Sequence, residues 1–85
     1  MAVEIGTVQT FSDVKPDKAQ ALKVLEEAAE VFGAWQLGDE DAGYLLDECA
    51  DVIQATCNLL AAYGVRDFTA YMEACRKRNV GRGRM

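Results

Sequence analysis

The sequence contains no histidine, and proline and cysteine are scarce. Its 85 residues include one proline and three cysteines. Histidine is the side chain that titrates near neutral pH and the commonest protein ligand for transition metals. Histidine-based acid–base catalysis and most zinc or copper sites are therefore excluded.

The three cysteines do not form a recognisable framework. Cys49, Cys57 and Cys75 are odd in number and show no CxxC spacing, which excludes a disulfide scaffold and a zinc knuckle. Cys49 and Cys57 are expected to be small core residues in a reducing compartment. No apolar run approaches the ~20 residues of a membrane span, and the N-terminus does not resemble a signal peptide. We therefore expect a soluble, cytoplasmic protein without a membrane partner.

The charge is acidic overall and unevenly distributed. The net charge is −5. Residues 1–65 carry twelve acids and three bases, net −9, whereas residues 66–85 carry two acids and six bases, net +4. A nucleic-acid polymer is not the expected partner, because such binders are basic overall. The pattern fits a site in which carboxylates hold a cation and a few basic side chains contact phosphate.

The apolar content is high for so short a chain. Hydrophobic residues make up 51% of the sequence, and 85 residues correspond to a single domain, residues 1–85. A domain of this size has few interior positions. We therefore predict a homo-oligomer that shares apolar helix faces between subunits; a compact monomer with alanine-rich helices is the alternative.

Helical periodicity dominates the sequence, and no strand pattern or internal repeat stands out. Apolar residues recur at helical spacing over residues 16–38 and again over about 42–63, and each stretch ends at a glycine. A third helix is expected after Asp67 and ends by about residue 80. The sequence predicts an all-α helical bundle with two long antiparallel helices and a third helix.

Three segments are less regular. Residues 1–14 have no clean periodicity, so an extended arm and a short helix both remain open. Residues 39–41 are acidic and form either a loop or the first turn of the second helix. Residues 76–85 form a basic tail.

Two acidic pairs stand out on the long helices. Glu27 and Glu30 lie three residues apart on the first helix, as do Glu48 and Asp51 on the second. Residues at this spacing share one side of a helix, and pairs on antiparallel neighbours can converge. Four carboxylates in one volume repel unless a cation lies among them, and an all-oxygen shell suits Mg²⁺ or Mn²⁺. The spacing favours a site for a divalent cation and phosphate.

The alternative is that these acids form the solvated face of amphipathic helices, as helical charges usually do. Glu27 and Glu48, however, lie at the borders of their apolar faces. Asp47 is followed four residues later by Asp51, and not by a base. The small side chain of Ala55 continues the acidic stripe and leaves room for a ligand.

The order of these acids resembles the signature of the MazG-like, all-α nucleoside triphosphate pyrophosphohydrolases. Glu-Glu-x-x-Glu at residues 26–30 is followed, after a gap of 17 residues, by Glu-x-x-Asp at residues 48–51. Surrounding segments match as well, and the resemblance covers about residues 15–82. These segments are residues 22–31, 46–55 and 58–65, with the basic Lys77-Arg78-Asn79 and Arg82.

The resemblance implies an oligomeric helical protein, either a dimer or a tetramer, that hydrolyses an NTP or dNTP to the monophosphate and pyrophosphate. It implies Mg²⁺ bound by Glu27, Glu30, Glu48 and Asp51. Glu26 would be an outer ligand or a ligand of a second metal ion.

For such a reaction we expect Glu26 or Glu27 to take a proton from the attacking water. Other residues are expected to bind the substrate. They are Lys77, Arg78 and Arg82 at the pyrophosphate, Asn58 at the sugar or base, and Trp35 stacked on the base. Each has a simpler alternative: a solubilising tail, a helix-surface amide, and core packing.

The sequence leaves other functions open. Within the same superfamily, the chain could be a dUTPase-like or dCTPase-like enzyme or a relative of phosphoribosyl-ATP pyrophosphohydrolase. Outside it, the chain could be a helical interaction module without catalytic activity.

Overall fold

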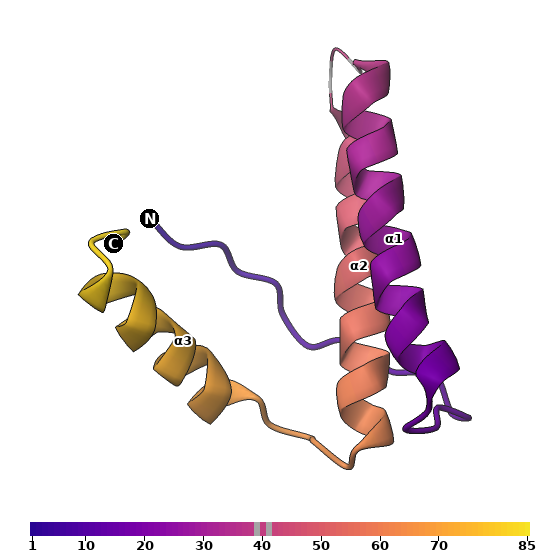
Figure 1. The fold of residues 1–85 in the computed structure, drawn as a ribbon, viewed down its shortest axis with the longest axis vertical. Helices are drawn as coiled ribbons and strands as arrows, with labels where there is room; N and C mark the ends of the chain where they lie inside the picture. Colours follow the sequence, from indigo (N-terminus) through magenta and orange to yellow (C-terminus); the bar gives the residue numbers. More distant parts are fainter. Residues whose placement is uncertain (39, 41) are drawn as a thin grey trace.

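The structure, a computed structural model, describes residues 1–38, 40 and 42–85, which form three helices and no strand. The helices are α1 (Lys18–Leu37), α2 (Gly43–Ala62) and α3 (Thr69–Gly81). α1 and α2 run antiparallel and pack side by side as a hairpin (Figure 1). The prediction of an all-α chain with two long antiparallel helices and a third helix is confirmed.

Local signals in the sequence set the ends of the helices. The carboxylate of Asp17 accepts a hydrogen bond from the Gln20 amide at 3.0 Å, so α1 begins two residues after Pro16. Gly38, with φ 72°, ends α1 in the left-handed conformation that glycine tolerates best. Gly64, with φ 77°, follows α2 in the same way. Asp39 and Asp41 of the acidic segment 39–41 lie outside the described residues.

α3 stands apart from the hairpin. The amide of Thr69, the first residue of α3, donates to the Asp67 carboxylate at 3.0 Å, but the N-cap position is Phe68 and not Asp67, the residue expected there. α3 makes no packing contact with α1 or α2 (Figure 1). Within one chain the expected bundle is therefore a two-helix hairpin with a separate third helix, because residues 63–68 lead α3 away from the pair.

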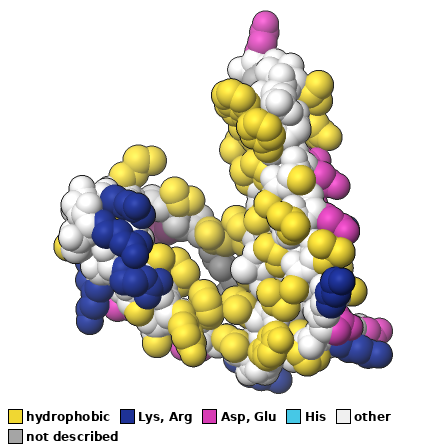
Figure 2. Space-filling view, viewed as in Figure 1, with side chains coloured by type: hydrophobic (Ala, Val, Ile, Leu, Met, Phe, Trp, Pro, Cys, Tyr) yellow, Lys and Arg dark blue, Asp and Glu magenta, His cyan; other side chains and the backbone are white. Residues whose placement is uncertain are grey.

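The hairpin buries few apolar side chains. Among the described residues, the buried hydrophobic ones are Ala34 and Ala55. Large apolar side chains lie exposed along the hairpin and α3, and Figure 2 shows them spread over one face of the molecule. Three polar side chains are buried instead: Glu27, Glu48 and Asn58. Carboxylates are rarely buried without a partner, which directs attention to this part of the hairpin.

The segment before α1 is an extended arm, which is one of the two forms left open by the sequence. Two side chains of α2 form hydrogen bonds with the backbone of this arm. The Phe11 amide donates to Asn58 Oδ1 at 3.0 Å, and Gln54 Nε2 donates to the Gln9 carbonyl at 2.9 Å. No described helix combines the length and apolar character that crossing a membrane requires.

Candidate active site

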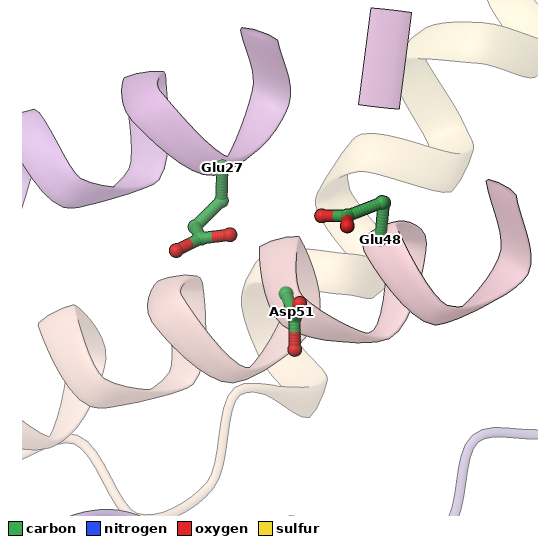
Figure 3. A group of neighbouring side chains, drawn as sticks. All are labelled: Glu27, Glu48 and Asp51. Atoms are coloured by element: carbon green, nitrogen blue, oxygen red, sulfur yellow. The ribbon is translucent and has the colours of Figure 1, made fainter. Parts of the chain in front are cut away.

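Three of the predicted metal ligands converge between the two long helices. Glu27 comes from α1, and Glu48 and Asp51 come from α2 (Figure 3). One carboxylate oxygen from each lies within 4.8 Å of the other two. Glu27 and Glu48 are buried, at 8% and 9% exposure, whereas Asp51 is exposed. We call these three residues the carboxylate cluster.

The chemistry of this cluster fits a hard divalent cation. Glu48 Oε2 is buried and has no hydrogen-bond partner among the described residues. A buried, unpaired carboxylate oxygen is unfavourable unless a cation or a donor compensates for its lost hydration. Three carboxylates supply an all-oxygen donor set, which is the set that Mg²⁺ and Mn²⁺ prefer.

A lysine that the sequence analysis overlooked lies at the edge of the cluster. Lys23 Nζ is 3.0 Å from Glu27 Oε1 and 3.9 Å from Glu26 Oε2. The hydrogen bond from Lys23 lowers the pKa of Glu27, and the same bond raises the pKa of Lys23. Among the acids of the two pairs, no base follows at a spacing of four residues. Lys23 precedes Glu27 by four residues, and that spacing was the available signal.

Glu30 lies beside the cluster without belonging to its closest trio. It is exposed. Hydrogen bonds with Glu27 and then Glu48, together with the negative charge of both, raise the pKa of its carboxyl group. The charge of Glu48 also raises the pKa of Tyr44. Negative potential is thus concentrated where the two acidic pairs meet.

A cavity of about 590 Å³ adjoins the cluster. Glu27 and Asp51 belong to both the cluster and the cavity wall. α1 and α2 form two sides, and the N-terminal arm contributes Phe11, Asp13 and Lys15. The volume is within the range of small-molecule sites. The irregular sequence of this arm contains no motif, so no role for it could be predicted from the sequence.

Two of the predicted substrate-binding residues lie in different surroundings. Asn58 lines the cavity and is 3% exposed, and its Oδ1 accepts hydrogen bonds from the Phe11 amide and from Gln54 Nε2, the latter at 3.1 Å. Trp35 is 65% exposed and stacks on Phe32 with ring centroids 5.9 Å apart. Trp35 does not line this cavity, and it is not packed in a core within the chain.

The predicted phosphate-binding bases lie away from the cluster in the same chain. Lys77 and Arg78 are exposed on α3, and Arg82 follows the last residue of that helix. Because α3 does not pack on the hairpin, the structure does not bring these bases to the carboxylates of their own chain (Figure 2).

The helices and the cluster define a class: the MazG-like, all-α nucleoside triphosphate pyrophosphohydrolases. The family model of phosphoribosyl-ATP pyrophosphohydrolase (PRA-PH) matches residues 6–79, which is most of the chain. The chain therefore belongs to the phosphoribosyl-ATP pyrophosphohydrolase family and is an enzyme that acts on phosphoanhydride bonds. No curated protein and no solved structure matches it. The resemblance seen in the sequence is confirmed.

Proposed function

We propose that the chain hydrolyses the bond between the α- and β-phosphates of phosphoribosyl-ATP, with Mg²⁺ as cofactor and Mn²⁺ as a possible substitute. The family match supports the reaction and the substrate. The metal dependence is supported by two observations: the convergence of Glu27, Glu48 and Asp51, and the buried Oε2 of Glu48, which has no hydrogen-bond partner among the described residues.

The residues divide into metal ligands and a proton acceptor. Glu27, Glu48 and Asp51 would hold Mg²⁺, with Glu30 as a fourth carboxylate. Mg²⁺ bound there would lower the pKa of a water molecule and neutralise phosphate oxygens. Glu26 or Glu27 would accept the proton of the attacking water. Lys23, already within 3.0 Å of Glu27, is placed to contact phosphate when that carboxylate binds the metal.

We further propose that the working enzyme is a homo-oligomer, either a dimer or a tetramer. The exposed apolar side chains of the hairpin and α3 support this assembly, because a monomer of this size would leave them in water. In this arrangement Lys77, Arg78 and Arg82 would contact the pyrophosphate bound to another copy, since they lie away from the cluster of their own chain.

A second candidate substrate is an ordinary NTP or dNTP. The cations among the described cavity residues are Lys15 and Lys23, and Lys23 is paired with Glu27. Phosphoribosyl-ATP carries one phosphate more than ATP. The small number of basic groups in the cavity therefore favours the simpler triphosphate, unless α3 of another copy supplies further cations.

A nucleotide panel tests these proposals. Phosphoribosyl-ATP, the four common NTPs, and the dNTPs including dUTP and dCTP are incubated with the protein and Mg²⁺, and the products are separated. We expect phosphoribosyl-ATP to have the highest kcat/KM and to yield the monophosphate and pyrophosphate. A preference for one NTP or dNTP would select the second candidate. Orthophosphate with a diphosphate would contradict the proposed bond cleavage, and a protein without turnover would be an interaction module.

A further inference from the structure

The N-terminal arm contributes Phe11, Asp13 and Lys15 to the cavity that Glu27 and Asp51 of the carboxylate cluster also line. We propose that residues 9–15 form the nucleoside-binding wall of the cavity, with the Phe11 ring against the base, and that Asn58 and Gln54 are positioning residues that hold this wall in place. This inference rests on the proposed function, because it needs a nucleotide whose phosphates lie at the carboxylate cluster.

The arm is fixed to α2 by a small polar network. Asn58 Oδ1 accepts from the Phe11 amide at 3.0 Å and from Gln54 Nε2 at 3.1 Å. Gln54 Nε2 also donates to the Gln9 carbonyl at 2.9 Å. Asn58 is 3% exposed, so its acceptor is shielded from competing water. Because the amide oxygen of Asn58 accepts from the arm and from Gln54, the role that we assign to this residue is to support the wall.

The arm is at the right distance from the cluster. Asp51 belongs to the cluster, and Asn58, which holds the arm, follows it by seven residues on α2. At 1.5 Å per helical residue, the two positions are roughly 10 Å apart along the axis. This separation is comparable with the distance from the α-phosphate to the base in a nucleotide. One cavity contains both ends, because Asp51, Asn58 and Phe11 all line it.

The composition of the wall indicates which part of the substrate it contacts. Phe11 is the aromatic residue among the described residues that line the cavity, and it is 66% exposed. Most other lining residues are charged or polar. Aromatic rings stack on the faces of bases with little preference for their identity. Phe11 is therefore suited to contact a base, while the acidic end of the cavity is suited to the metal-bound phosphates.

Steady-state kinetics with Phe11→Ala, Phe11→Tyr and Ile5→Ala tests the wall. Ile5 is the matched control, because it is an exposed apolar residue of the same arm that does not line the cavity. We expect Phe11→Ala to raise KM about tenfold, as the loss of one stacking contact would, with kcat nearly unchanged. Phe11→Tyr keeps the ring and should retain the wild-type KM, as should Ile5→Ala. An unchanged KM in Phe11→Ala would overturn the inference.

The support role of Asn58 is tested in the same assay. Asn58→Leu removes the acceptor for both donors and should raise KM in the same way as Phe11→Ala. Asn58→Asp keeps an oxygen acceptor for the arm and should be closer to the wild type. If both variants at Asn58 had the wild-type KM while Phe11→Ala did not, the support role would be wrong.

Hydrogen–deuterium exchange gives a readout that does not depend on turnover. The probe is α,β-methylene-ATP, which carries adenosine and a triphosphate that resists cleavage at the proposed bond. With Mg²⁺ and this probe, amides of residues 9–15 should exchange more slowly than with Mg²⁺ alone. Unchanged exchange in this segment would contradict the wall. A wild type inactive on the whole nucleotide panel would overturn the proposed function together with this inference, whereas an active wild type with an indifferent arm would overturn the inference alone.

Discussion

The hairpin and α3 use their side chains in opposite ways. The α1–α2 hairpin buries two carboxylates and an amide, and its buried apolar side chains among the described residues are two alanines. α3 buries none of its residues and exposes Tyr71 and Met72. The interior of the hairpin thus contains polar side chains where apolar ones would be expected. The surface of α3 contains large apolar side chains where polar ones would be expected.

This difference separates two tasks within a short chain. The hairpin assembles the carboxylate cluster from residues of one chain, so the proposed metal ligands do not depend on another copy. α3, with its exposed apolar side chains and basic residues, makes no contact with either helix of the hairpin. We therefore expect substitutions in the carboxylate cluster to affect mainly catalysis, and substitutions in α3 to affect mainly assembly.

The largest effect should come from removing the metal. EDTA should abolish turnover, because no other cation in the hairpin can replace a divalent ion at three carboxylates, and excess Mg²⁺ or Mn²⁺ should restore it. The measurement is pyrophosphate release before and after chelation. Full activity in EDTA would show that the hairpin cluster is not a catalytic metal site.

Single carboxylate changes should come next. Glu48→Gln and Asp51→Asn keep shape but remove charge from the cluster, and each should reduce kcat by about a hundredfold or more. Both variants should fold, and in metal-free buffer they should be at least as stable as the wild type, since carboxylate repulsion is relieved. Glu40→Gln, in the described part of the loop before α2, is the matched control and should change little. A Glu48→Gln variant with full activity and a lower Tm would make these acids structural.

α3 should respond differently, in assembly and not in metal binding. Light scattering at micromolar concentration should show a dimer or a larger oligomer of the 9.3 kDa chain. Replacing Tyr71 and Met72 together by Glu should shift the protein towards the monomer, because charge is unfavourable in an apolar interface. Ala70→Glu, on the other face of α3, is the control. A wild-type monomer, or a double variant that stays oligomeric, would contradict the role given to α3.

Much of the fold could be predicted because it depends on local signals. Helical periodicity identified the three helices, and Gly38 and Asp67 marked an end and a beginning of helices. The separation of α3 from the hairpin could not be predicted. The spacing of apolar residues shows that a helix has an apolar face. It does not show whether the element that packs on that face belongs to the same chain.

The site was predictable to the extent that it follows from helix spacing. Glu27, Glu48 and Asp51 converge because i, i+3 pairs on antiparallel helices face the same gap. The arm was not predictable, because Phe11 reaches Asn58 across 47 positions of the sequence without any periodic pattern. The position of Asn58 on the second helix was visible in the sequence, whereas the donors that its oxygen accepts from were not.

The smallest expected effect concerns Glu30 and the pH dependence of stability in EDTA. In the folded protein, the hydrogen bonds and negative charges of Glu27 and Glu48 raise the pKa of Glu30. The Glu30 carboxyl group therefore stays protonated to a higher pH in the folded state than in the unfolded state. Its stabilising contribution is therefore present below the ordinary pKa of a glutamate and is lost as the pH rises through the raised value. Glu30→Gln is always neutral, so it should raise Tm at pH 7 by on the order of 2 °C and lose that advantage near pH 4.

Thermal unfolding at a fixed protein concentration measures this effect, with Glu4→Gln in the exposed arm as the control for removing one charge. Added Mg²⁺ should reverse the order at pH 7, because a cation among the carboxylates stabilises the wild type more than a variant with one ligand fewer. This reversal ties the small shift to the hairpin cluster and not to net charge, which Glu4→Gln changes equally. A Glu30→Gln variant with the lower Tm in EDTA at pH 7 would mean that the Glu30 carboxylate stabilises the hairpin without a metal ion. Carboxylate repulsion would then not be a feature that distinguishes the hairpin from α3.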